Sequence, residues 1–173
     1  MECKCSICVS YCKSQPGWFL PGEAEKAAEF MDLTLQEFFD RYLGVNWWVG
    51  DHTDGEADAF VLAPAITVMQ PGEEYPAMPK GVCIFLKEGL CQIHGAKPYE
   101  CAETMHDDGN ELSTSRRKKM VVAWKENQAQ ISELLKRDPR ANEMSLLDWF
   151  ELTLYDLGEY AEHGGLEDEA ENS

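Results

Sequence analysis

The seven cysteines of this 173-residue chain fall into two short groups, and the distance between the groups constrains the fold more than any other feature. The first group lies within the first dozen residues and contains Cys3, Cys5, Cys8 and Cys12. The second contains Cys83, Cys91 and Cys101. Thiolates are strong ligands for zinc and iron–sulfur clusters, and metal sites gather them at short spacings. A fold that uses both groups at one site must bring the N-terminus onto residues 83–101.

The redox context favours metal binding over disulfides. No apolar segment typical of a secretory signal follows Met1, and no run approaches the roughly 18 apolar residues that a membrane helix needs. We therefore expect a cytoplasmic protein with no membrane partner, in which thiols stay reduced. An odd number of cysteines also cannot pair completely in disulfides within one chain. Clustered cysteines in this setting indicate a metal site.

Length and composition predict one globular domain over residues 1–165. The 44% of hydrophobic residues, with five Trp and seven Phe, are sufficient for a core. The formal net charge of -17 argues against a protein that coats nucleic acid, because phosphate binding needs clustered cations. Residues 166–173 are acidic and are predicted to form a disordered tail.

The first half of the chain contains signals for both helices and strands. A helix is predicted at residues 23–31 and another from Thr34 onward. Thr34 is a good N-cap, Glu37 completes a capping box with it, and Gly44 is expected to end the helix. Aromatic and branched runs predict short strands at residues 47–49, 60–62 and 66–68.

The N-terminus and the C-terminal part complete the predicted architecture. Residues 1–15 show no hydrophobic period and are predicted to form a loop whose shape the metal sets. Apolar spacing predicts one helix at residues 114–137 and another from Ser145 to about residue 162, paired as an antiparallel helical hairpin. The predicted fold class is therefore α+β, with a small metal-organised cysteine-rich region and a β-hairpin packed on several α-helices, including that C-terminal pair.

Two turns are compatible with the β-hairpin predicted within residues 81–94. A three-residue loop with Gly89 in the left-handed conformation would pair Leu86 with Leu90. A two-residue turn at Glu88-Gly89 would shift this pairing by one residue. The three-residue loop is favoured.

The choice of turn decides which side chains share a face of the hairpin. The favoured turn places Cys83 and Cys91 on one face, within reach of one metal site, and His94 on the other. The two-residue turn would place Cys83 beside His94 and direct Cys91 away. The favoured register therefore predicts that Cys83 and Cys91 are both ligands and that His94 is not.

Cys101 is the third candidate ligand of the second group. Pro98 suits the first position of a helix, so Cys101 is expected near a helix N-terminus, where the helix dipole lowers a thiol pKa. A reactive cysteine would share this signature. His106 is the best histidine candidate for an additional ligand, although an exposed loop histidine is the favoured interpretation.

Three short motifs follow one another in the second cysteine group: Cys83-Ile-Phe85-Leu86, then Cys91-Gln-Ile93-His94, then Lys97-Pro98 with Cys101. They resemble the pattern CxFL…CxIY..RP..C of the YkgJ-type cysteine-cluster proteins, described as a zinc- or iron-chelating CxxCxxCC domain. The resemblance extends to residues 22–30, 33–38 and 42–43 and covers residues 3 to about 107. His94 stands where the family has Tyr, and the family's terminal CC is replaced by Cys8 and Cys12.

The resemblance implies that the N-terminal and 83–101 cysteines jointly chelate zinc or iron. A related cysteine cluster in a flagellin lysine methylase resembles an iron–sulfur site, which implies a [4Fe–4S] cluster as the alternative cofactor. The expected ligands are Cys5, Cys8, Cys12, Cys83, Cys91 and Cys101, with Cys3 as an uncertain addition. Four thiolates complete one site, so one site or two remain open. A metalloenzyme or redox protein acting on an unknown substrate is the alternative function, with no catalytic residue identified.

Residues 116–119, Arg-Arg-Lys-Lys, form the only basic run of the chain. Placed near a helix N-terminus, this run opposes the helix dipole and needs compensation. Asp107, Asp108 and Glu111 are the expected ion-pair partners. The alternative is that an anionic partner or substrate docks there.

Overall fold

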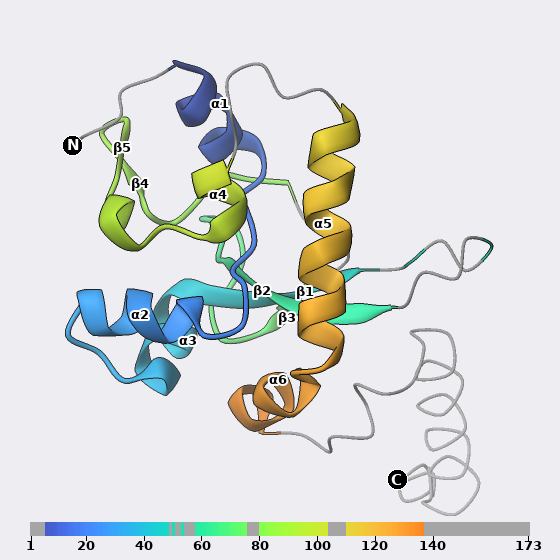
Figure 1. The fold of residues 1–173 in the computed structure, drawn as a ribbon. Coiled ribbons are helices and arrows are strands. Elements are labelled where there is room, and N and C mark those ends of the chain that lie inside the picture. Colours follow the sequence, from blue (N-terminus) through green and yellow to red (C-terminus); the bar gives the residue numbers. More distant parts are fainter. Residues whose placement is uncertain are drawn as a thin grey trace, which may run out of the picture.

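The computed structural model describes residues 6–48, 50, 53, 58–75, 80–103 and 110–136 (Figure 1). Helices surround a small mixed sheet, so the predicted α+β class is confirmed. Several sequence predictions lie outside the described residues: the helix after Ser145 and its pairing, the acidic tail, and the positions of Cys3, Cys5 and His106. No helix among the described residues is long and apolar enough to cross a membrane.

The described N-terminal residues form a helix, α1 (Ser6–Ser14), and the predicted loop over this segment is wrong. The segment contains no Gly or Pro before Pro16, so nothing in it opposes a helix once it packs against the rest of the chain. Helical spacing brings Cys8 and Cys12, four residues apart, onto the same side of α1.

The next two helices follow the predicted boundaries closely. They are α2 (Glu23–Phe30) and α3 (Leu35–Tyr42). The capping box at α3 is confirmed, because the Thr34 N–H donates to Glu37 Oε2 at 2.9 Å and the Glu37 N–H donates to Thr34 Oγ1 at 3.2 Å. This pair satisfies N–H groups that a helix start leaves without partners.

The predicted role of Gly44 as a helix stop is wrong. The helix ends at Tyr42, and Gly44 lies inside strand β1 (Leu43–Trp48). A Cβ at this position would lie 2.3 Å from Cε2 of Tyr75, so glycine is needed there for the close approach of the Tyr75 ring. Tyr75 belongs to β3 (Glu74–Tyr75), a strand that the sequence patterns did not predict.

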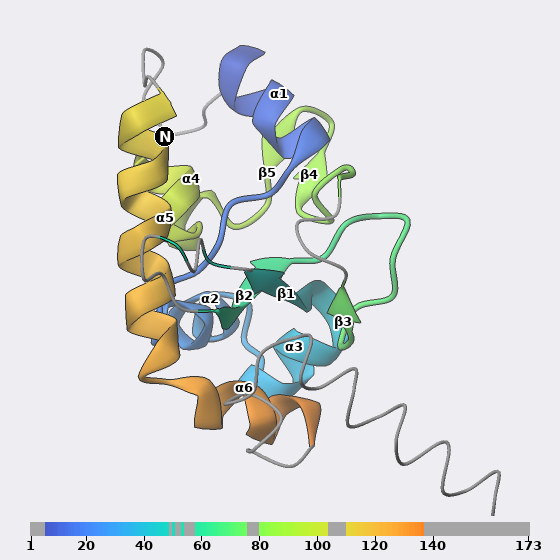
Figure 2. The ribbon, with the colours of Figure 1, turned by 90° about the vertical axis from the view of Figure 1, so that its right-hand side faces the viewer.

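The central sheet has the order β2-β1-β3 in the part of the chain that the structure describes. Strand β2 (Ala59–Pro64) pairs antiparallel with β1, and β3 pairs parallel with β1. The strand predicted at residues 66–68 is reduced to a single bridge between Ile66 and Cys83. Figures 1 and 2 place α1, α4 (Tyr99–Glu103) and the hairpin of β4 (Leu86–Lys87) and β5 (Leu90–Cys91) at one end of the molecule. The helices α2, α3 and α6 (Gln128–Leu135) lie at the other end.

The helix predicted at residues 114–137 is two helices, α5 (Asn110–Lys125) and α6 (Gln128–Leu135). The break falls at Asn127, the N-cap of α6, whose side-chain amide donates to the Ala123 carbonyl at 2.8 Å. Trp124 anchors the end of α5, because its indole N–H donates to the Phe19 carbonyl at 2.7 Å and its side chain is fully buried. The break lets both helices pack against the sheet (Figure 2).

The buried side chain of Gln128 takes the place of a neighbouring strand along β2. Its Nε2 donates to the Phe60 carbonyl at 2.9 Å, and its Oε1 accepts from the Phe60 N–H at 3.3 Å. Nε2 also donates to the Trp124 carbonyl at 2.8 Å. Phe60 therefore keeps both backbone hydrogen bonds at the side of β2 that faces away from β1.

The second sheet is the predicted hairpin, formed by β4 (Leu86–Lys87) and β5 (Leu90–Cys91). Leu86 pairs with Cys91, so the favoured three-residue loop is wrong and the two-residue turn is correct. Glu88 and Gly89 have φ values of 52° and 77°, the positive pair that suits the right-handed twist of the strands. The twist therefore outweighs the cost of holding Glu88 at positive φ.

Candidate metal site

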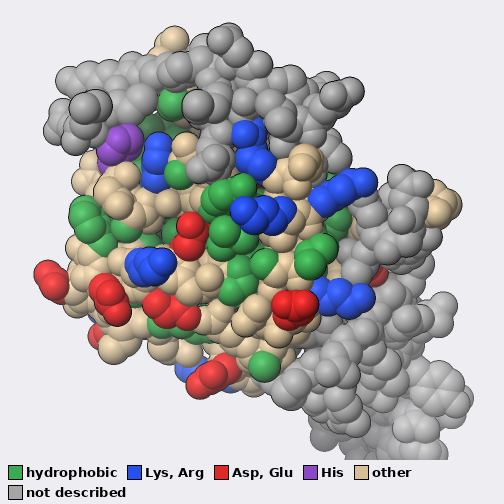
Figure 3. Space-filling view, in the orientation of Figure 1, with side chains coloured by type: hydrophobic (Ala, Val, Ile, Leu, Met, Phe, Trp, Pro, Cys, Tyr) green, Lys and Arg blue, Asp and Glu red, His purple; other side chains and the backbone are tan. Residues whose placement is uncertain are grey.

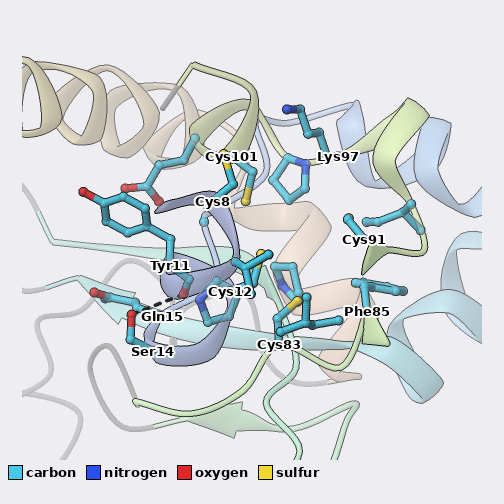
Figure 4. Close-up of a pocket in the computed structure, with 18 of the residues that line it drawn as sticks. Cys8, Tyr11, Cys12, Ser14, Gln15, Cys83, Phe85, Cys91, Lys97 and Cys101 are labelled. Carbon is cyan, nitrogen blue, oxygen red and sulfur yellow. Dashed lines mark hydrogen bonds between the residues drawn. The ribbon is translucent and has the colours of Figure 1, made fainter. Parts of the chain in front are cut away.

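One cavity of about 350 Å³ brings together all five cysteines that the structure describes. It lies at the end of the molecule formed by α1, the β4–β5 hairpin and α4 (Tyr99–Glu103), and α5 also contributes to its wall. The lining includes Cys8, Cys12, Cys83, Cys91 and Cys101 (Figure 4). Its volume is at the lower end of the range for small-ligand pockets.

Backbone hydrogen bonds hold α1 against the segment that precedes the hairpin. The Cys83 N–H donates to the Cys12 carbonyl at 2.7 Å, and the Gly81 N–H donates to the Ser14 carbonyl at 2.9 Å. These bonds connect the segments that contain the two cysteine groups, which lie far apart in the sequence. Figure 4 shows the Cys12 and Cys83 side chains meeting in the cavity, with Cys101 directed toward them from α4.

Cys83 is held between a bridge and a tight turn. Its bridge to Ile66 fixes the strand direction, and the Leu86 N–H donates to the Cys83 carbonyl at 3.0 Å. This turn directs the N–H groups of Phe85 and Leu86 at the Cys83 sulfur. Hydrogen bonds of this kind favour the thiolate over the thiol.

The remaining cysteines of the second group have similar backbone donors. The Cys91 sulfur accepts a hydrogen bond from the Ile93 N–H, and the Cys101 sulfur accepts one from the Gly17 N–H. Gly17 approaches Cys101 so closely that an added Cβ would lie 2.8 Å from its sulfur. Cys91 also reaches the cavity despite the register that was expected to direct it away, because Cys83 lies in the turn before β4 and not on a strand opposite it.

Two partly buried carboxylates fix the position of α4. Glu100 Oε2 accepts from the Trp18 N–H at 3.0 Å. Glu23 Oε2 accepts from the N–H groups of Leu20 and Tyr99, at 2.8 and 2.9 Å. Cys101 is thereby held in place by contacts on both sides of its short helix.

Burial raises the pKa of the cavity thiols. It raises the pKa of Cys83 to about 12, and the neighbouring Cys12 and Cys91 thiols contribute in the same direction. Burial also raises the pKa of Cys101, with smaller contributions from Cys12, Cys83 and Glu100. The expected lowering at Cys101 is therefore wrong, because desolvation outweighs the dipole of a five-residue helix.

The positions of these thiols limit which kind of metal site could form without a movement of the side chains. Among the described residues, no group of three Cys, His, Asp or Glu side chains is arranged to hold one metal ion. The sulfurs share a cavity wall and influence one another's pKa, but they do not converge on one point. The donor chemistry fits a soft metal, whereas a single tetrahedral ion would require the sulfurs to move inward.

Sequence reasoning missed the polar side chains that share the cavity. His94, expected on the opposite face, lines it from the one-turn helix η2 (His94–Ala96). Lys97 and Arg116 also line it. The alternative two-residue turn placed His94 beside Cys83, so choosing that turn from the sequence would have predicted His94 at the site. No local pattern indicated that α5 would face the cysteines.

One residue of the basic run, Arg117, has a described ion-pair partner that the sequence did not suggest. The run lies within α5, which begins at Asn110. Arg117 Nε donates to Glu100 Oε1 at 3.0 Å, and its guanidinium lies 5.7 Å from the Trp18 ring centroid. Asp107 and Asp108 lie outside the described residues, as does the Glu111 side chain. Glu100 supplies the described ion pair.

Comparison with protein-family models, with curated proteins and with solved structures finds no match for this chain.

Proposed function

We propose that this is a metal-binding protein in which cysteines of α1 and of residues 83–101 jointly hold iron, as an iron–sulfur cluster. The observation that supports the proposal is the cavity lined by five cysteines from three separate segments. The thiols of Cys12, Cys83 and Cys91 raise the pKa of neighbouring thiols in this cavity, so these sulfurs lie close enough to act on one another. Such a group of sulfurs is the ligand set that clusters use.

The effects of the cysteines on one another's pKa indicate which of them lie close together. Cys12 and Cys83 both raise the pKa of Cys101, and Cys91 raises that of Cys83. These four residues are the proposed ligands, which matches the four thiolates of a cluster. Cys8 lines the same cavity and is the described alternative. Cys3 and Cys5 stay predictions from the sequence.

A cluster fits the described residues, in which no three Cys, His, Asp or Glu side chains are grouped to hold one metal ion. A cluster presents a different metal atom to each cysteine, so its ligands need not meet at one point. The backbone N–H donors to Cys83, Cys91 and Cys101 add support, because hydrogen bonds to ligand sulfurs stabilise their negative charge. Zinc is the second candidate, supported by the same donor set, and it requires the thiols to move closer together.

Anaerobic purification followed by iron, zinc and acid-labile sulfide analysis tests the proposal. We expect a brown protein with iron and sulfide in equal amounts. The Cys83→Ala variant should lose most of this iron. Val82→Ala is the matched control, because Val82 is the preceding residue, is 37% exposed and does not line the cavity.

Two results would contradict the proposed site. A colourless protein with stoichiometric zinc would reject the cluster and retain the metal site. Full metal content in Cys83→Ala would reject joint chelation by the two cysteine groups. Circular dichroism of each variant verifies that lost metal does not reflect an unfolded chain.

A further inference from the structure

Two of the cavity cysteines, Cys12 and Cys83, belong to segments that lie directly against each other. The Cys83 N–H donates to the Cys12 carbonyl at 2.7 Å. Both side chains line the cavity as free thiols, and Figure 4 shows them next to each other. The fold therefore brings two unbonded cysteines to adjacent backbone positions, although about seventy residues separate them in the sequence.

This backbone contact suits a disulfide between the two residues. Residues paired by backbone hydrogen bonds in antiparallel strands have Cα atoms about 5.5 Å apart. Disulfides join Cα atoms about 4.4–6.8 Å apart, so the direct bond brings Cys12 and Cys83 into this range. The Cys12 thiol also contributes to the raised pKa of Cys83, which indicates that the two sulfurs are close. A disulfide could therefore form by rotation of the two side chains, without a large movement of the backbone.

The other neighbours of Cys12 are less suited to such a bond. Cys8 lies four residues away on α1, where Cβ atoms are about 5–6 Å apart, whereas a disulfide needs about 3.5–4.5 Å. The Cys101 sulfur accepts a hydrogen bond from the Gly17 N–H. In the described part of the chain, one backbone hydrogen bond joins cysteines of two different segments, and it joins Cys12 to Cys83.

We propose that Cys12 and Cys83 form a reversible disulfide in the metal-free protein, which makes loading of the metal site sensitive to oxidation. The loading part of this inference rests on the proposed function, since Cys12 and Cys83 are two of the four proposed ligands. Zinc and iron–sulfur clusters bind thiolates, and a disulfide has none to offer. The disulfide therefore removes half of the ligand set and links α1 covalently to the segment before β4.

A peroxide is the oxidant that this reaction needs. Cys12 is partly exposed, whereas Cys83 is 5% exposed, so Cys12 reacts first. An S–O bond forms at Cys12 as the O–O bond breaks, which gives a sulfenic acid and one water. The Cys83 sulfur then attacks the Cys12 sulfur, so that the S–S bond forms, the S–O bond breaks and a second water leaves. The two thiols lose two electrons, and one hydrogen peroxide is reduced to two waters.

Peroxide treatment of the metal-free, full-length protein tests the pairing. Hydrogen peroxide is neutral, so its entry does not depend on the Lys and Arg side chains that gather over α5, one wall of the cavity (Figure 3). Remaining thiols are alkylated, and the chain is cleaved after Lys and Arg. This cleavage places Cys83 on residues 81–87 and Cys12 on residues 5–13. We expect these two peptides to be linked until a reductant separates them.

Two variants identify the cysteine on the N-terminal peptide, which also contains Cys5 and Cys8. Cys12→Ser should lose the link. Cys8→Ser is the matched control, because Cys8 lies on the same helix and lines the same cavity, and it should form the link as the parent does. Circular dichroism verifies that both variants fold. Fragmentation of the linked peptides in the mass spectrometer locates the bond in the parent protein independently of either variant.

Zinc binding tests the control of metal loading. Zn²⁺ is the probe because it binds thiolates and has no redox chemistry of its own. Loss of second-shell partners alone costs about 10–100-fold in metal affinity, so loss of two direct ligands should weaken zinc binding by about a hundredfold or more. Competition with a chromophoric chelator measures this affinity before and after peroxide treatment. Reduction of the oxidised protein should restore it.

The possible results separate the disulfide from the metal site. Absence of the link, a link that persists in Cys12→Ser, or a bond from Cys12 to Cys101 overturns the inference and leaves the metal site in place. Equal zinc affinity before and after the link forms overturns the control of loading. A reduced protein that forms the link but binds neither zinc nor iron rejects the metal site alone, and the pairing of Cys12 with Cys83 stands.

Discussion

Replacing Gly17 with alanine should disturb the cysteine cavity specifically. An added Cβ would lie 2.8 Å from the Cys101 sulfur, 2.9 Å from the Cys101 backbone nitrogen and 2.9 Å from Glu100 Cβ. Carbon contacts are optimal at about 3.5–4.0 Å, so α4 would have to move by about 0.7 Å. The hydrogen bonds that Glu100 accepts from the Trp18 N–H and from Arg117 Nε resist that movement.

The expected loss of stability follows from two opposing effects. Overpacking costs about 1–3 kcal/mol in a well-packed site. The lower entropy of the unfolded alanine chain offsets about 0.4–1 kcal/mol of this cost. Gly17→Ala should therefore lower the free energy of unfolding by about 1–2 kcal/mol. Urea unfolding followed by tryptophan fluorescence measures this change, and metal analysis should show a reduced content because Cys101 is displaced.

Gly95→Ala is the matched control for this prediction. Its added Cβ would meet first the Phe30 ring, at 3.1 Å, and Phe30 is 55% exposed and can rotate away. The control should keep both its stability and its metal content. The reasoning is refuted if Gly17→Ala matches Gly95→Ala in both measurements.

Three further predictions concern the core and the thiols. Gln128→Leu should lower the free energy of unfolding by about 1–3 kcal/mol for each Phe60 backbone group that it leaves without its partner, as measured in urea. Metal-free protein should lose stability between pH 9 and 12, by about 1.4 kcal/mol per pH unit for a thiol such as Cys83, because the unfolded chain deprotonates first. Cys83→Ala should reduce that slope. Metal loading at pH 7 should release close to one proton per cysteine ligand, as measured in weakly buffered solution with a pH indicator.

Local signals in the sequence predict local structure well in this protein. Thr34 and Glu37 lie within one turn, so their capping box depends on no distant contact and could be predicted. The hairpin was also located correctly, but its register was not. Glu88 must adopt positive φ in the observed turn, and only the combined twist of both strands makes that conformation preferable.

Features that depend on tertiary packing could not be predicted from the sequence. The α1 helix has weak intrinsic signals and is held by backbone bonds to Gly81 and Cys83, about seventy residues away. Lys97 and Arg116 reach the same cavity from different elements, and neither has a local pattern that points to the other. The close approach of Gly17 to Cys101 likewise arises only when residues 16–18 pack on α4.

The hydrogen bonds of Gln128 to Phe60 have a consequence for self-association. A strand edge with open N–H and C=O groups can recruit a strand from a second molecule and lead to aggregation. In the described part of the sheet, a single side-chain amide occupies that edge at Phe60 and blocks such recruitment there. The helices α5 and α6 also pack on β2, so this edge is covered as well as hydrogen-bonded.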